Sequence, residues 1–296
     1  EGPDGISAVN DVKKALDDLA QKGPIKGLIL DLRDNRGGFL MQAVGVAGLF
    51  IKSGVIVISK TADGKEHFFR DLKPGIEYTG PLVILTSKMT ASAAEIVTQA
   101  LQDYGVAIVV GDERTYGKGS IQMQTVTTKG VDSPLKITVG QYYSVSGKST
   151  QVEGVKADIV VPSVFFNRRM GEEYLHFPLA LEGGAVPAAF DDKLIDIEPA
   201  MKEWYLQYYL PNLQTPVHIK PQVRKELQAR SKERMDKNQE YQRFLSGLSL
   251  YKVVKHGDKE ETVKLTKEEA QRRIWALQMQ EAVNVAKDLA ELQTKV

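Results

Sequence analysis

Short apolar runs and longer stretches of helical periodicity alternate along the first half of the chain. The apolar runs are rich in β-branched residues and too short for helices, which predicts buried strands; they cover residues 27–33, 55–59, 81–85 and 107–110. Between them, apolar residues recur every three or four positions, which predicts amphipathic helices over about 8–19, 40–50 and 92–104. This alternation predicts a mixed α/β core with helical crossovers between its strands.

Polar and apolar residues alternate further along the chain, which predicts additional strands. We expect one strand over 121–126 and a pair of strands over 135–139 and 141–145. The dipeptide Asp63-Gly64 predicts the turn of a hairpin.

The composition changes after about residue 168. Turn-forming residues around Gly183-Gly184 and Pro187 indicate a linker. From Gln222 onward, charges of both signs surround sparse apolar positions, which is typical of a solvated helix. The last apolar positions, over 274–292, predict an amphipathic helix that docks on the body of the protein. We therefore predict a core over 1–168 and a mostly helical C-terminal domain over 169–296.

Composition excludes several classes of function. With 39 basic and 38 acidic residues the net charge is +1, which gives no electrostatic case for nucleic-acid binding. The chain has no cysteine, which excludes disulfides and thiolate metal sites. No run of 18 apolar residues predicts a membrane span, and the polar stretch 1–5 does not resemble a signal peptide.

Ser92 follows the apolar run 81–85 and a turn of small residues, at the predicted start of a helix. One interpretation is structural: Ser92 and Glu95 have the spacing of a capping box, and capping serines greatly outnumber catalytic ones. The other interpretation is catalytic, because a hydroxyl at a helix N-terminus lies near free N–H donors that stabilise an oxyanion.

A catalytic serine needs a base. None of the four histidines has a neighbouring carboxylate in a recognisable motif, so no Ser-His-Asp triad is predicted. Lys118 is an alternative base, because burial lowers the pKa of a lysine and its flanking glycines, Gly117 and Gly119, allow a close backbone approach. A lysine between glycines is more often a surface turn.

The same segment also suggests a phosphate-binding loop, which requires G-x4-G-K-[ST] at the start of a helix. Here five residues separate Gly111 from Gly117, Gly119 takes the place of the Ser or Thr, and a strand is predicted to follow. The sequence therefore argues against nucleotide binding.

Several motifs in order resemble the carboxy-terminal processing proteases of peptidase family S41, in particular their tail-specific branch. They are Ala-Ser-Ala-Ala-Glu-Ile at 91–96, Gln-Asp-Tyr-Gly at 102–105, Tyr-Gly-Lys-Gly at 116–119, and the apolar run ending in Asp-Leu-Arg at 31–33, followed by Asp-Asn-Arg-Gly-Gly at 34–38. The resemblance implies a crotonase-like or ClpP-like core. It also implies that a signal sequence, an N-terminal helical region and a PDZ domain precede this segment, so we expect the chain to be a fragment.

The resemblance assigns a role to each motif residue. Ser92 matches the nucleophile and Lys118 the base, and Gln122 matches a glutamine that orients this lysine in some members. Backbone N–H groups of Gly37 or Gly38, together with that of Ala93, match the oxyanion hole. Two departures from the family pattern are Ala94, where a second serine is frequent, and a loop before Lys118 that is one residue longer.

The resemblance implies a serine endopeptidase with a Ser-Lys dyad that acts through an acyl-enzyme. Its substrates would be periplasmic proteins with apolar, unstructured C-termini, and it would need no metal or cofactor. A homo-oligomer, or association with the N-terminal and PDZ regions, is also consistent with it. The alternative hypothesis is a catalytically incompetent fragment or a scaffold module in which Ser92 is only a helix cap.

Overall fold

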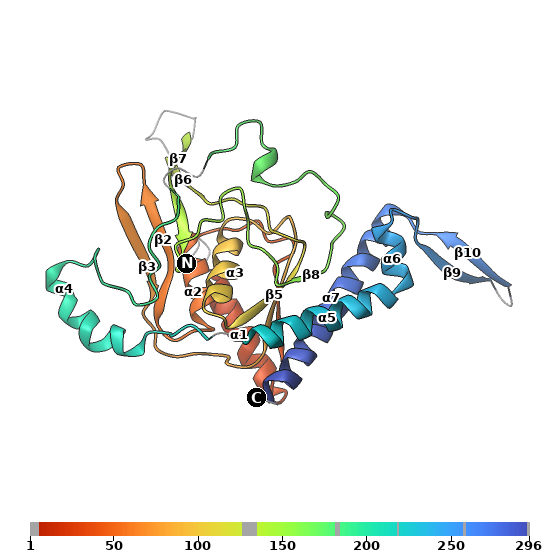
Figure 1. The fold of residues 1–296 in the computed structure, drawn as a ribbon, viewed down its shortest axis with the longest axis horizontal. Coiled ribbons are helices and arrows are strands. Elements are labelled where there is room, and N and C mark those ends of the chain that lie inside the picture. Colours follow the sequence, from red (N-terminus) through yellow and green to blue (C-terminus); the bar gives the residue numbers. More distant parts are fainter. Residues whose placement is uncertain (1–5, 126–134, 181–183, 218, 257–258, 295–296) are drawn as a thin grey trace.

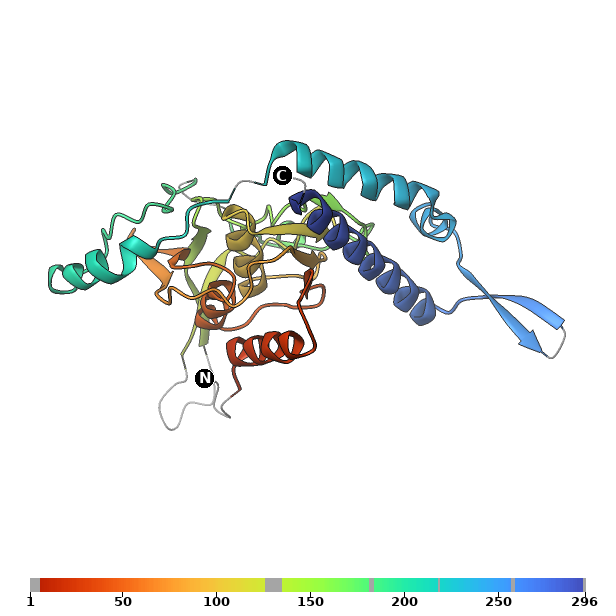
Figure 2. The same ribbon diagram turned by 90° about the horizontal axis from the view of Figure 1, so that it is seen from below.

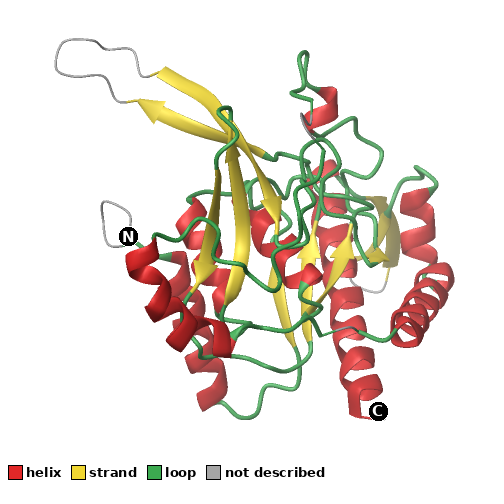
Figure 3. Ribbon diagram, turned by 60° about the vertical axis from the view of Figure 1, so that its left-hand side comes forward, coloured by secondary structure: helices red, strands yellow, loops and turns green. Residues whose placement is uncertain are grey.

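The computed structural model describes residues 6–125, 135–180, 184–217, 219–256 and 259–294 (Figure 1). The strands of its two four-stranded sheets run through the middle of the molecule, with helices on both sides (Figure 3). This arrangement confirms the predicted mixed α/β core with a helical C-terminal part.

The first sheet is parallel and has the strand order β1-β4-β5-β8. Its strands are β1 (Leu28–Asp31), β4 (Leu82–Thr86), β5 (Ala107–Gly111) and β8 (Ile159–Val160). Every residue of β4 and β5 is buried, which explains why both read as continuous apolar runs in the sequence.

The second sheet is antiparallel and has the order β3-β2-β7-β6. Its strands are β2 (Gly54–Thr61), β3 (Glu66–Asp71), β6 (Ser120–Thr125) and β7 (Leu135–Ser144). The hairpin predicted at Asp63-Gly64 joins β2 to β3, and Gly64 has a φ of 82°. Residue 126, the last of the strand predicted over 121–126, lies outside the described residues.

The pair of strands predicted over 135–139 and 141–145 is wrong. The segment forms one strand, β7, and continues through Gly140 without a turn. A Cβ at Gly140 would lie 2.4 Å from the carbonyl oxygen of Lys60 on β2. This glycine therefore marks a close approach between neighbouring backbones within the sheet.

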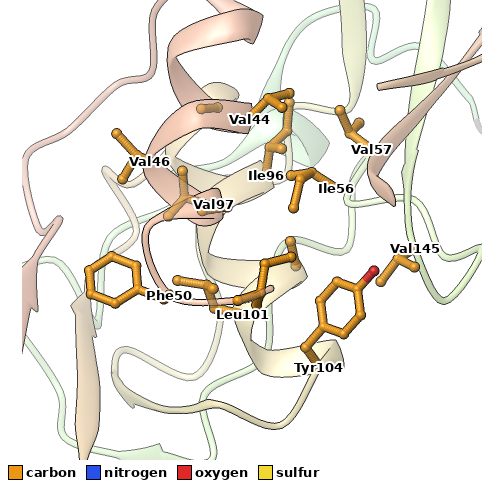
Figure 4. Packing of buried hydrophobic residues seen from close by; sticks show 14 of the residues in the cluster. Val44, Val46, Phe50, Ile56, Val57, Ile96, Val97, Leu101, Tyr104 and Val145 are labelled. Atoms are coloured by element: carbon orange, nitrogen blue, oxygen red, sulfur yellow. The ribbon is translucent and has the colours of Figure 1, made fainter. Parts of the chain in front are cut away.

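The parallel sheet lies between two hydrophobic layers. Successive residues of a strand point to opposite faces. Leu82 and Ile84 of β4 pack in a cluster with α2 (Leu40–Gly48), α3 (Ala93–Asp103) and strands of the second sheet. Figure 4 shows side chains of this cluster on α2 and α3. The helix α1 (Ala8–Gln21) contributes its buried Leu16.

The opposite face of the sheet is covered by the C-terminal helices. Val83 and Leu85 of β4 pack in a second cluster with residues of α5 (Pro221–Lys237), α6 (Gln239–Leu245) and α7 (Lys267–Thr294). The predicted docking of the last helix is confirmed. The predicted division at residue 168 stays a prediction.

Smaller elements complete the C-terminal part. A short 3-10 turn spans Glu172–Tyr174, and α4 (Pro199–Trp204) continues into a π-helical turn and a 3-10 turn that end at Asn212. A hairpin of β9 (Tyr251–His256) and β10 (Lys259–Lys264) lies at the opposite end of the molecule from α4 (Figures 1 and 2). The sequence analysis did not predict this hairpin, because its strands are short and rich in charged residues.

None of the described helices combines the length and the apolar character needed to cross a membrane.

We predict that α7 and the parallel sheet unfold together. Leu289 is 1% exposed in the second cluster, so Leu289→Ala should lower the free energy of unfolding by about 2–5 kcal/mol. The control Leu248→Ala, at a position that is 54% exposed, should change it by less than about 0.5 kcal/mol. Urea unfolding followed by far-UV circular dichroism and by tryptophan fluorescence should give coincident transitions. Separate transitions would show that α7 unfolds independently.

Candidate active site

Ser92 lies in a sharp turn between β4 and α3, with φ 56° and ψ −121°. A positive φ is uncommon for a residue other than glycine, and such strain persists only where surrounding contacts hold it. The N–H of Ala91 donates to the carbonyl of Asn35 at 3.0 Å, and the carbonyl of Thr90 accepts the N–H of Tyr116 at 2.9 Å. The turn is therefore fixed on both sides by loops that follow β1 and β5.

The capping interpretation holds for the backbone N–H of Ser92 but not for its hydroxyl. Only the Glu95 half of a capping box is formed: the Glu95 carboxyl accepts the Ser92 N–H at 2.8 Å. The N–H of Glu95 is bonded to the Ser92 carbonyl oxygen at 2.8 Å, and the Ser92 side chain makes no cap hydrogen bond. The hydroxyl is therefore left available for chemistry.

Glu95 has a second role that the sequence analysis missed. Besides Ser92, its carboxyl accepts hydrogen bonds from Thr115 Oγ1 at 2.5 Å, the Gly117 N–H at 2.7 Å and the Lys118 N–H at 2.9 Å. Glu95 is completely buried, and this burial raises its pKa to about 7, although the four donors favour the charged form. A single carboxyl group thus joins the turn of Ser92 to the loop of Lys118.

Lys118 is half-buried and its ammonium donates to Gln122 Oε1 at 3.0 Å. Burial lowers the pKa of Lys118, and repulsion by Lys136 lowers it further, whereas Glu172 and Glu95 oppose the shift. These surroundings favour the neutral amine more than water does.

Ser92 and Lys118 line the same cavity, which has a volume of about 260 Å³. Gly38, Gln122 and Tyr142 also border it. Among the described residues, no hydrogen bond joins the Ser92 hydroxyl to the Lys118 ammonium. The predicted nucleophile, base and orienting glutamine therefore line one cavity.

The two glycines predicted for the oxyanion hole differ in their surroundings. Gly37 has a φ of 89°, and a Cβ there would lie 2.7 Å from the Ala91 carbonyl oxygen, so only glycine fits against the Ser92 turn. Its N–H is bonded to Asn35 Oδ1 at 2.9 Å. Gly38 faces open space, and within the described part of the chain neither its N–H nor that of Ala93 has an acceptor.

Tyr142 of β7 is a further site residue that the sequence analysis missed. Its buried hydroxyl lies 3.2 Å from the Ser92 carbonyl oxygen and also contacts that of Lys118, while it accepts a hydrogen bond from Thr150 Oγ1 at 3.1 Å. Burial raises the pKa of Tyr142 well above its ordinary value, so the hydroxyl stays neutral and can donate. No local sequence motif indicated this contact, because β7 lies far along the chain.

A larger, mostly apolar cavity of about 440 Å³ adjoins the glycine loop. Gly38, Phe39 and Ala93 border both this cavity and the one that holds Ser92 and Lys118. Its apolar lining residues include Leu30, Leu32, Ala43, Val46 and Val97. Among the described residues, no three His, Asp or Glu side chains gather as a candidate metal site.

A family profile matches more than half of the chain. The profile of peptidase family S41 matches residues 5–161, which include every predicted site residue. The chain belongs to peptidase family S41. The resemblance to this family that was inferred from the motifs is confirmed.

Individual S41 proteases are similar over about half of the chain. It is 37% identical to the tail-specific protease of Haemophilus influenzae over 174 residues, which are 57% of this chain and 25% of that protein. It is 38% identical to the carboxy-terminal-processing protease of Bartonella bacilliformis over 156 residues, which are 51% of this chain and 35% of that one. The matched segments span only 25% and 35% of the lengths of these two curated relatives.

Among solved structures of the family, the photosystem II D1 C-terminal processing protease is similar at 30% identity and a TM-score of 0.47. That similarity covers 52% of this chain and 39% of the other.

We predict that Glu95 makes the stability of this S41 chain depend on pH. Its pKa is about 7 when folded, against an ordinary value of 4.5, so the folded state binds more protons between these values. The resulting stabilisation is fully present below pH 4.5 and is lost as the pH rises to 7, by up to about 3 kcal/mol.

Urea unfolding of wild type and Glu95→Gln across pH 4 to 8, a range chosen to bracket both pKa values, measures this effect. The unfolding free energy of wild type minus that of Glu95→Gln should decrease from pH 4.5 to 7 and be constant outside this window. Glu113→Gln, at an exposed carboxylate in the loop that precedes Lys118, is the control for replacing a carboxylate by an amide near the site. A constant difference for Glu95→Gln would contradict the assignment.

Proposed function

We propose that this chain carries the catalytic site of a serine endopeptidase in which Ser92 is the nucleophile and Lys118 the general base. The observation that carries the proposal is the strained backbone of Ser92, which leaves its hydroxyl without a capping bond in the cavity that Lys118 also lines. Strain of this kind is common at active sites, and a pure helix cap would not require it.

The reaction would begin with proton transfer from the Ser92 hydroxyl to the neutral amine of Lys118. Ser92 Oγ attacks the carbonyl carbon of a peptide bond, and the tetrahedral intermediate collapses to an acyl-enzyme. The leaving amine takes the proton from Lys118. Lys118 then deprotonates the water that attacks the acyl-enzyme and passes this proton to Ser92 Oγ as the new C-terminus is released. Gln122 would orient the Lys118 amine through the bond to its Oε1.

The oxyanion would accept hydrogen bonds from the N–H groups of Gly38 and Ala93. Both groups border the Ser92 cavity and lack another acceptor within the described residues, whereas the N–H of Gly37 is bonded to Asn35. In this proposal Gly37 contributes by allowing the loop to approach the Ser92 turn, and Gly38 is the donor.

The proposed substrates are proteins with apolar, unstructured C-termini. The apolar cavity beside Gly38 and Ala93 offers room for an apolar side chain next to the scissile bond. The names of the relatives, tail-specific and carboxy-terminal-processing protease, support action near a protein C-terminus. A periplasmic location, oligomerisation and a contribution from a PDZ domain stay predictions from the family resemblance.

We expect Ser92→Ala and Lys118→Ala each to abolish cleavage of an unfolded protein with an apolar C-terminus. The fold should persist in both, with Ser92→Ala costing at most about 1 kcal/mol of stability. Lys148→Ala, at an exposed lysine, is the matched control and should cleave like wild type. If Ser92→Ala is destabilised but cleaves normally, Ser92 is only a cap and the scaffold hypothesis is favoured.

The proposed base also predicts how the pH profile responds to nearby charge. Cleavage by wild type should increase with pH as Lys118 loses its proton. Lys136→Gln removes a repulsive charge and raises the pKa of Lys118, so the profile of kcat/KM should move to higher pH. Glu172→Gln removes an attractive charge and should move it to lower pH. Shifts in the same direction, or none, would argue against Lys118 as the titrating base.

A further inference from the structure

Arg33 lies where β1 ends and the glycine loop begins, yet its side chain points to the C-terminal helix. Its guanidinium Nη1 donates to the Trp275 carbonyl oxygen at 2.8 Å and to Gln278 Oε1 at 3.3 Å. The guanidinium carbon also lies 4.7 Å from the centre of the Trp275 ring. Arg33 is only 6% exposed, and its remaining donors pair with Asp31. Contacts across more than 240 residues of sequence therefore fix this arginine.

Gln278 of α7 is fully buried and uses both ends of its amide. Its oxygen accepts from Arg33, and its Nε2 donates to the Val161 carbonyl oxygen at 2.8 Å. The Val161 N–H in turn donates to Gly111, the last residue of β5, at 2.7 Å. A buried amide with both ends paired is a rigid connection, because breaking either bond leaves a polar group unsatisfied.

The constraint on Arg33 continues along the backbone to the glycine loop. The Arg33 carbonyl accepts a hydrogen bond from the hydroxyl of Ser87, in the segment that leads to Ser92. Two residues later, Asn35 accepts the N–H of Ala91 on its carbonyl and the N–H of Gly37 on its side chain. The short loop from Arg33 to Gly38 is thus held by α7 at one end and by the Ser92 turn at the other.

We propose that α7 positions the oxyanion-hole loop through Gln278 and Arg33. This inference rests on the proposed function, because it assigns the Gly38 N–H to the oxyanion. Neither residue touches the substrate; both are positioning residues. A hydrogen-bond donor stabilises a transition state only when it is held close to the productive geometry, so a small displacement of Gly38 should lower the rate of the chemical step.

Gln278→Met tests the proposal, because methionine keeps the approximate size and removes both hydrogen bonds. In the full chain we expect kcat to fall roughly tenfold or more and KM to stay within about threefold of wild type. The reason is that the displaced donor stabilises the transition state more than it stabilises the bound substrate. Gln278→Glu keeps the acceptor for Arg33 and should retain more of kcat than Gln278→Met. Gln280→Met, at an exposed position of the same helix, should match wild type.

A second readout separates positioning from general loosening of the fold. A peptide aldehyde, which forms a tetrahedral adduct with the serine, should bind more weakly to Gln278→Met than to wild type. An uncleaved ground-state peptide should bind both proteins equally. Leu289→Ala removes packing from α7 without touching Arg33, so it should leave kcat of the folded protein close to wild type. An equal loss of kcat in Leu289→Ala, or an unchanged kcat in folded Gln278→Met, would overturn the proposal.

Different results would show that the proposed Ser92–Lys118 dyad, and not the role of α7, is wrong. If wild type neither cleaves nor forms the aldehyde adduct, or if Ser92→Ala retains both properties, the dyad itself is wrong. If wild type meets both criteria and Ser92→Ala meets neither, the Gln278 variants alone decide the role of α7.

Discussion

The carboxyl group of Glu95 is the constraint on which the site depends. The Ser92 turn and the Lys118 loop follow different strands and share no continuous secondary structure, so their separation is set by contacts across the gap. Glu95 contributes four hydrogen bonds to these contacts: one oxygen accepts from Ser92 and Lys118, and the other from Thr115 and Gly117. A completely buried carboxyl group with every lone-pair direction engaged costs much to displace, because any movement leaves a donor or acceptor unpaired in a dry interior.

The parallel sheet explains why these loops meet at all. The glycine loop follows β1, the Ser92 turn follows β4 and the Lys118 loop follows β5, and these three strands are neighbours. Because the carboxyl ends of parallel strands lie at one edge of a sheet, segments that are distant in sequence converge there. The antiparallel sheet closes the site from the other side, since β6 carries Gln122 and β7 carries Tyr142.

The sequence predicted those parts of this arrangement that depend on local patterns. The apolar runs predicted three strands of the parallel sheet, β1, β4 and β5, but not the short β8. The ordered motifs gave Ser92 and Lys118 as candidate site residues. The long-range contacts left no local pattern: Glu95 was recognised as a cap, but its bonds to the Lys118 loop depend on the fold. The difference between Gly37 and Gly38 also depends on the fold, because the N–H of Gly37 is bonded to Asn35 and that of Gly38 has no acceptor among the described residues. Gly140 misled the prediction, since a glycine within a strand and one in a turn look alike in sequence.

Burial lowers the pKa of the Lys118 amine, and the side chain that accepts its hydrogen bond does not reverse this effect. The side chain to which it donates is Gln122, a neutral amide, and a carboxylate at that position would favour the ammonium form. The nearby carboxyl of Glu95 does oppose deprotonation, but it directs its lone pairs to backbone N–H groups and to Thr115, and not to the amine. The same carboxylate can therefore hold the backbone of Lys118 in place without forming an ion pair with its side chain. In the proposed mechanism, this separation of roles allows one buried acid to position both loops while the lysine remains able to accept a proton.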